Sequence, residues 1–216
     1  MDALYKQLQT RSFVKLADID CIDELVEELD SLELTLLPYT VERDGKIVRP
    51  LDLDVTSLID RSRDPAAGSQ GWDVRNGDNR IVETTLAQSA PKMMKVIYQL
   101  FDKLWITRVR ISRLAPNSNM LLHKHPYLAQ YNNEVVVHLV LKTNSSVQAV
   151  VVNAEQVHTQ HFATGEVWYL NTLHPHKFQN NGDSDRYHLW INLVWHRDQQ
   201  GTSKKLRDMV AAALAK

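Results

Sequence analysis

The fold of this chain is decided by two stretches of alternating side chains, ITRVRISRL at residues 106–114 and RYHLWINLVW at residues 186–195. Successive side chains of an extended strand point to opposite faces, so each stretch predicts a strand with one polar and one apolar face. Three further candidate strands lie between them, separated by clusters of Pro, Asn, Gly and Ser, at residues 134–142, 147–152 and 165–170. Five strands without intervening helices predict an antiparallel sandwich or barrel.

The polar faces of these two strands predict a small polar site inside the barrel. Arg108, Arg110 and Ser112 share one face of residues 106–114 and oppose Val109 and Ile111. On residues 186–195, the corresponding face carries Arg186, His188, Trp190 and Asn192. We interpret the tryptophan as core or cavity wall, whereas His188, beside Arg186, is a candidate to hydrogen-bond a bound ligand.

The first half of the chain has helical rather than alternating patterns. Residues 20–30 predict an amphipathic helix, and residues 39–48 predict a short hairpin around an Arg-Asp-Gly turn. A second helix is expected from about Pro91 to Leu104, with Ser89 as its N-cap.

A long loop is predicted at residues 60–80, which are rich in Asp, Arg, Gly and Asn and surround Trp72. An aromatic side chain on such a loop is a candidate to close over a substrate. Ordinary anchoring of the loop by Trp72 explains the same pattern, and the sequence leaves both interpretations open.

Composition restricts the class of protein. The 216 residues are 44% hydrophobic and 24% charged, which predicts one globular core with elaborations. A net charge of −1 provides no field for nucleic acid or an anionic membrane, and we see no apolar run of the roughly 20 residues that span a bilayer. Cys21 is the only cysteine, which excludes an internal disulfide. We therefore expect a soluble, cytoplasmic protein.

All nine histidines lie between His123 and His196, which focuses the search for chemistry on the β region. His123 and His125 are separated by one residue, so on an extended strand both imidazoles point the same way, about 6.5–7 Å apart along the backbone. A second such pair ends at His176, and Arg186 follows ten residues later. Imidazole is the commonest neutral metal ligand, and a guanidinium matches a carboxylate. Either pair alone is more often a surface or packing feature, but the combination indicates a metal site with a carboxylate-binding arginine.

The β region resembles the aspartyl/asparaginyl β-hydroxylase family of iron(II)/2-oxoglutarate dioxygenases. The similarity lies in residues 110–123, 134–144 and 165–171, in His176, in Asn180, Asn181 and Gly182, and in residues 186–196. The spacings of Ser112 to His123 and of His176 to Arg186 are its most specific part. The resemblance implies a double-stranded β-helix core of the jelly-roll or cupin-like kind at residues 105–197. Residues 1–104 would then pack outside it as a helical and loop region, and residues 198–216 would form a C-terminal helix.

Carried over residue by residue, the resemblance implies that His123 and His176 bind iron and that Arg186 holds the distal carboxylate of 2-oxoglutarate. Ser112 would assist Arg186, and His138 would contact the end of the co-substrate that chelates the metal. A guanidinium inside a barrel independently requires an anion to offset its desolvation. For Ser112 and His138, the residues alone leave a purely structural role open.

The chain departs from the common pattern at the third metal ligand. Many 2-oxoglutarate oxygenases have a carboxylate two residues after the first histidine, and here that residue is His125. Some members of this branch use only two protein ligands, so His125 is either a neutral third ligand or a substrate contact. His174 is the weaker candidate because the ten-residue spacing to Arg186 selects His176.

The resulting hypothesis is a hydroxylase that uses iron(II) and 2-oxoglutarate on an unactivated carbon of an amino acid or peptidyl side chain. Arg108 and Arg110 are candidates to bind a substrate carboxylate. One alternative is a cupin-type dioxygenase with a three-histidine iron site and no 2-oxoglutarate. Another is a non-enzymatic β-sandwich binding module that collects a metal adventitiously. The sequence does not indicate the substrate's identity or the oligomeric state.

Overall fold

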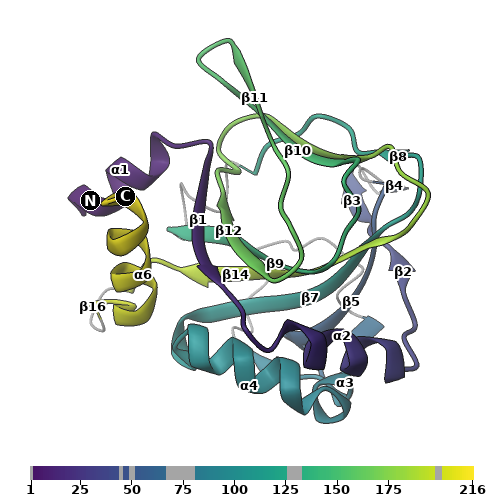
Figure 1. Ribbon diagram of the computed structural model, residues 1–216. Helices are drawn as coiled ribbons and strands as arrows, with labels where there is room; N and C mark the ends of the chain where they lie inside the picture. The colour runs from purple at the N-terminus through teal and green to yellow at the C-terminus, as the bar shows by residue number, and fades with distance from the viewer. Residues whose placement is uncertain (1, 44–45, 49–51, 67–80, 126–132, 198–200) are drawn as a thin grey trace.

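Two antiparallel sheets face each other and enclose a barrel interior (Figure 1). The structure is a computed structural model that describes residues 2–43, 46–48, 52–66, 81–125, 133–197 and 201–216. The larger sheet has the order β1 (Phe13–Asp18), β12 (Glu166–Leu170), β9 (Glu134–Lys142), β14 (Arg186–Val194), β7 (Ile106–Leu114), β5 (Asp54–Asp60) and β2 (Leu37–Pro38), with β6 (Val82–Glu83) beside β5. The smaller sheet has the order β11 (Gln156–Gln160), β10 (Val147–Asn153), β13 (His176–Asn180) and β8 (Ser118–Asn119).

The longer strands of the larger sheet contribute to two separate apolar clusters, as the alternation predicts for β7, β9 and β14. One cluster lies between the sheets and includes Val136, Val140 and Trp190 from the larger sheet with Val151 and Phe178 from the smaller one. The other covers the outer face and includes Val109, Ile111, Val137, Leu139, Leu189 and Ile191. The mainly β double-stranded β-helix fold is therefore confirmed, with a barrel interior that contains the polar candidates.

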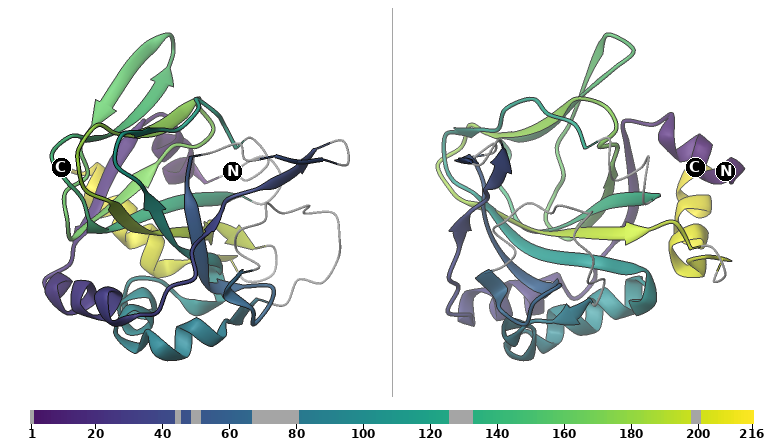
Figure 2. Two further views of the ribbon diagram at one scale, coloured as in Figure 1. Left: turned by 90° about the vertical axis from the view of Figure 1, so that its right-hand side faces the viewer. Right: turned by 180° about the vertical axis from the view of Figure 1, so that it is seen from behind.

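Helices cover the outer face of the larger sheet, as Figures 1 and 2 show. The helices α2 (Ile22–Ser31), α3 (Thr85–Ser89) and α4 (Pro91–Leu100) form one layer, and α1 (Ala3–Gln9) packs with α6 (Lys204–Leu214) beside β1. The predicted helix near residues 20–30 is confirmed. So is the hairpin near residues 39–48, formed by β3 (Val41–Arg43) and β4 (Lys46–Val48). A further short pair joins β15 (His196–Arg197) to β16 (Gly201–Thr202).

The start and end of α4 differ from the prediction. Ser89 is not its N-cap, because that serine ends α3 and Ala90 occupies the capping position. The first turn is capped instead by Glu28 of α2, whose carboxylate accepts hydrogen bonds from the backbone N–H groups of Lys92 and Met93, each at 2.7 Å. A charge-assisted cap of this kind replaces the missing serine. The helix ends at Leu100, and a 3₁₀ turn at Lys103–Trp105 leads into β7.

Residues before position 105 contribute four strands to the larger sheet that sequence analysis did not predict, the short β2 and β6 and the longer β1 and β5. β1 pairs with β12 at one edge of the larger sheet, and β5 pairs with β7. β5 escaped notice because all of its residues after Asp54 are buried, so its sequence DVTSLID lacks alternation. The division of the chain at residues 105 and 197 stays a prediction. Within the described ranges, no helix is long and apolar enough to cross a membrane.

Candidate metal centre

Three histidines meet at one end of the barrel interior. His123 lies in the segment after β8, and His176 begins β13. Their backbones form an antiparallel bridge in which His123 N–H donates to His176 at 3.1 Å and His176 N–H donates to His123 at 2.7 Å. One nitrogen of each ring, with one from His125, lies within 4.8 Å of the other two. The structure therefore brings the three predicted metal ligands together.

Two of these imidazoles are oriented by hydrogen bonds to backbone carbonyls. Nδ1 of His123 is 2.8 Å from the carbonyl oxygen of Leu121, and Nδ1 of His176 is 2.9 Å from that of His174. A carbonyl oxygen only accepts, so Nδ1 carries the hydrogen in both rings and Nε2 keeps its lone pair. A metal-binding histidine has this tautomer, with its other nitrogen held by an outer partner.

Burial keeps the three rings neutral. Desolvation lowers the pKa of His176 to about 3, and the nearby His123 lowers it further in the same direction. Desolvation also lowers the pKa of His123, and it lowers that of His125 well below the ordinary value, with His176 as the next cause. Because only a neutral imidazole binds a metal ion, the cluster is in a ligating state at neutral pH.

A buried arginine lies in the barrel interior, against His188 and Phe178. Arg186 has no exposed surface, and its Nη1 donates to Nδ1 of His188 at 2.6 Å. Its guanidinium carbon lies 4.2 Å from the centre of the Phe178 ring. Nε and Nη2 have no hydrogen-bond partner among the described residues. Burial lowers the pKa of Arg186 to about 9, so the group remains charged at neutral pH. A buried cation with two unused donors is a site for an anion.

Ser112 and His138 complete the polar part of the interior. Ser112 is opposite His188 in the β7–β14 register, and its buried hydroxyl has no partner within the described residues. The same is true of both ring nitrogens of His138, whose ring centre lies 4.9 Å from that of His188. Unsatisfied buried polar groups in a native fold call for an explanation, and an absent polar ligand is one.

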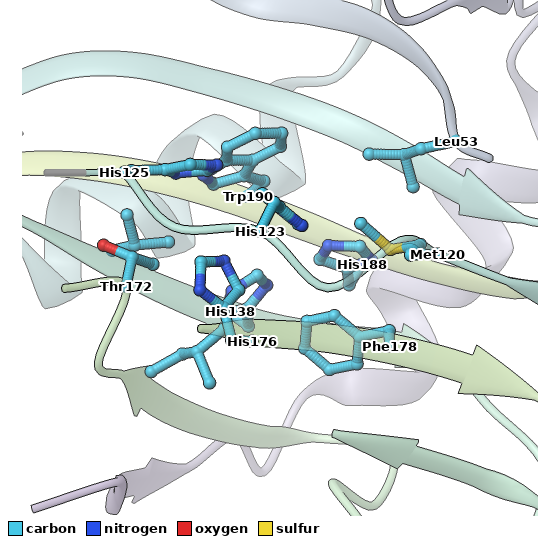
Figure 3. A pocket seen from close by; sticks show the side chains of 12 residues that line it. Leu53, Met120, His123, His125, His138, Thr172, His176, Phe178, His188 and Trp190 are labelled. Carbon is cyan, nitrogen blue, oxygen red and sulfur yellow. The ribbon is translucent and has the colours of Figure 1, made fainter. Parts of the chain in front are cut away.

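One pocket joins the histidine cluster to His138 and to His188, the hydrogen-bond partner of Arg186. His123, His125, His176, His138 and His188 line it, and Figure 3 shows their rings around the same space. Its apolar wall includes Leu53, Met120, Phe178 and Trp190. The space measures about 330 Å³, including the part open to solvent. Small-molecule sites combine an apolar wall with a few convergent polar groups in this way.

Of the predicted substrate residues, Arg108 and Arg110 are not among the described residues that line this pocket. Arg108 forms a buried ion pair with Asp60 at 2.9 Å, so its charge is already neutralised within the fold. The guanidinium of Arg110 lies 4.8 Å from the ring centre of Trp190 and 5.1 Å from that of Tyr39. Trp72 lies outside the described residues. Their roles toward substrate stay predictions.

Phe178 and Asp60 are among the residues of this region that sequence analysis missed. Phe178 lines the pocket from β13, and recognising residues 176–180 as a strand would have placed it on the same face as His176. Asp60 lies at the end of β5, a strand without a period-two signal, so no local pattern connects it with Arg108.

Comparisons with known proteins place this geometry in context. A family model described as aspartyl/asparaginyl beta-hydroxylase matches residues 60–197. The chain is 30% identical over 110 residues to an L-proline cis-4-hydroxylase of Rhizobium meliloti (strain 1021), and that match covers 51% of this chain but 38% of the relative.

Two solved structures share the fold along most of their length. An oxidoreductase of the 2OG-Fe(II) oxygenase family from Burkholderia pseudomallei has a TM-score of 0.58 at 18% identity, and the match covers 93% of this chain and 92% of that one. A prolyl-4-hydroxylase from Pseudomonas putida has a TM-score of 0.50 at 15% identity, with 89% and 97% covered. At these identities the likeness concerns the fold alone.

Proposed function

Because the chain belongs to the aspartyl/asparaginyl β-hydroxylase family, we propose that it is an iron(II)- and 2-oxoglutarate-dependent oxygenase. In this proposal it hydroxylates an unactivated carbon of an amino acid or of a peptidyl side chain. The observation that carries the proposal is a single pocket that joins a three-imidazole cluster to His188, which is hydrogen-bonded to a buried arginine with unused donors. Hydroxylation of an amino acid fits the activity named for the L-proline cis-4-hydroxylase relative.

The donor set fits iron(II). His123 and His176 each present Nε2, and His125 supplies the third nitrogen in place of the usual carboxylate. Three neutral ligands leave coordination positions for other molecules. With 2-oxoglutarate, bound iron(II) supplies the chemistry that inserts one oxygen atom of dioxygen into a carbon–hydrogen bond, while the co-substrate becomes succinate and carbon dioxide.

The chain's other residues bind and orient the co-substrate. Nε and Nη2 of Arg186 have the fork geometry that suits the distal carboxylate of 2-oxoglutarate, and the hydroxyl of Ser112 donates to the same group. His188 holds the guanidinium through its Nδ1. His138, between Arg186 and the histidine cluster, serves the other end of the molecule. Binding a dianion here offsets the desolvation of Arg186.

The three-histidine cluster also favours a second candidate, a cupin-type dioxygenase that uses no 2-oxoglutarate. A cupin-type dioxygenase without 2-oxoglutarate provides no anion for the unused donors of Arg186. We therefore rank this candidate below the hydroxylase. A binding module without catalysis is the third reading.

The decisive experiment is aerobic incubation of the protein with iron(II), ascorbate and 2-oxoglutarate against a panel of free amino acids and short peptides. Succinate formation and the gain of one oxygen atom by the substrate, seen by mass spectrometry, are expected for the wild type. His176→Ala serves as the matched control without turnover. Substrate oxidation that proceeds without 2-oxoglutarate would favour the cupin candidate, and binding without any oxidation would favour the module.

A further inference from the structure

The three histidines of the candidate metal centre are held in different ways. Backbone carbonyls orient the rings of His123 and His176 through Nδ1. Among the described residues, no group hydrogen-bonds the imidazole of His125. Its backbone is anchored, because its N–H donates to the carbonyl of Thr172 at 2.8 Å. The orientation of its ring therefore depends on packing.

Trp190 provides that packing. The rings of His125 and Trp190 are stacked, with centres 5.9 Å apart and planes inclined by 19°, and Figure 3 shows them side by side. A ring separation in this range is typical of offset stacking. The flat indole limits rotation of the imidazole about its side-chain bonds, because turning the ring out of the parallel arrangement brings its edge against the indole.

Trp190 is itself rigidly held. It lies in β14, which is paired on both sides, with Arg110 of β7 and His138 of β9 as its register partners. The guanidinium of Arg110 lies 4.8 Å from the centre of the Trp190 ring, a cation–π contact, and Tyr39 packs on the indole at 5.9 Å. The indole is thus a fixed surface.

We propose that Trp190 is a positioning residue that aims the imidazole of His125 at the metal. It performs for the third ligand the task that backbone carbonyls perform for the other two. The proposal rests on the proposed metal centre, but it requires neither 2-oxoglutarate nor turnover. It predicts that replacing Trp190 weakens metal binding only through His125.

The test is a titration of the metal-free protein with Co(II), followed by visible absorption, which reports both affinity and ligand geometry. Trp190→Met removes the flat surface, and we expect it to weaken Co(II) binding about tenfold, the usual scale for a residue that orients a ligand. Trp190→Phe keeps a flat ring and is expected to restore most of that loss. The matched control is Trp168→Met, because Trp168 stacks on Phe162 in the same barrel and, among the described residues, has no ring contact with the three histidines. Co(II) affinity should not change in this control.

A double-mutant cycle isolates the route of the effect. In a His125→Ala background, Trp190→Met is expected to leave the remaining Co(II) affinity and spectrum unchanged. An equal loss in both backgrounds, or wild-type affinity in Trp190→Met, would overturn the proposal. Thermal unfolding of each metal-free variant confirms that it is folded, and Trp190→Leu replaces Trp190→Met if that variant does not fold.

The outcome is separable from the proposed function. A wild-type protein that binds no Co(II) would overturn both this proposal and the metal centre. If the double-mutant cycle shows the expected coupling between Trp190 and His125 but the protein forms no succinate, the role of Trp190 is supported. Only the proposal of a hydroxylase is then overturned.

Discussion

Replacing Arg186 with Met tests the proposed co-substrate site most directly, because it removes the buried charge and keeps an apolar side chain in its place. Burial lowers the pKa of Arg186 from its ordinary value to about 9, which corresponds to an unfavourable contribution of about 5 kcal/mol. Because the folded pKa is below the unfolded one, this cost is complete at any pH below about 9 and disappears only as the pH rises to the ordinary pKa of an arginine.

Two contacts offset that cost in the wild type. The hydrogen bond to His188 contributes about 1.5–3 kcal/mol, and the contact with Phe178 contributes up to about 2 kcal/mol. The metal-free Arg186→Met variant should therefore unfold within about 2 kcal/mol of the wild type, instead of losing the several kcal/mol typical of a large buried side chain. Loss of the charge-assisted pair should cost about 2–5 kcal/mol of 2-oxoglutarate affinity, roughly 30- to 5,000-fold.

The assay is urea unfolding with and without 2-oxoglutarate, in the absence of oxygen and with Mn(II) as a redox-inactive metal. At 100 times its Kd, the ligand should stabilise the wild type by about 2.7 kcal/mol and Arg186→Met by at most about 0.9 kcal/mol. Arg108→Met is the matched control, because it removes the charge that pairs with the buried Asp60 and leaves that carboxylate, among the described residues, only its hydrogen bonds from Ser57 and the backbone of Arg61. It should lose about 3–5 kcal/mol of stability but keep the ligand-dependent gain. Full 2-oxoglutarate stabilisation of Arg186→Met would refute the reasoning.

Three further predictions concern the histidines. His123→Ala and His176→Ala should each abolish iron(II) binding in equilibrium dialysis, since each removes one of few ligands, and retention of full affinity in either would reject the metal assignment. His125→Asp should retain iron(II) by restoring a two-histidine, one-carboxylate set, whereas His125→Ala should bind iron(II) more weakly. A nitrogen ligand lies ~2.0–2.1 Å from its metal ion. A solved structure of the metal-bound protein with His125 more than about 4 Å from the ion would therefore exclude ligation. The metal-free protein should lose stability as the pH falls from 6.5 towards 3, because the pKa of folded His176 is about 3 and the unfolded chain takes up the proton first. His176→Gln should remove about 1.4 kcal/mol per pH unit from that slope, and an unchanged slope in urea unfolding would contradict the neutral buried ring.

Local pattern determined the β core of this protein. Period-two alternation is a property of the strand itself, so β7 and β9 were predicted with the bounds that the structure has, and the apolar and polar faces of β14 were assigned correctly. The spacing between the residues of a motif is likewise a local feature of the chain. The spacing of His176 to Arg186 and the pair His123 and His125 were therefore visible in the sequence.

Tertiary structure alone decided which of these residues meet and what they lack. The bridge that joins His123 to His176 links segments far apart in the chain, and its register depends on how the smaller sheet closes. The tertiary structure also decides that Arg108 pairs with Asp60, so the charge of this arginine is already neutralised within the fold. No local pattern encodes such partners, because they are set by strand order.

Burial was the other quantity that the sequence left undetermined. The unused donors of Arg186 and the stack of His125 on Trp190 exist because both sheets exclude water from the interior. The local sequence around a charged or aromatic residue does not show whether that residue lies on the surface or in the core. Only in the core does desolvation make such a side chain require a partner. The residue types of the site were thus determined by the sequence, and the need for an anion beside Arg186 arose only when the barrel closed around it.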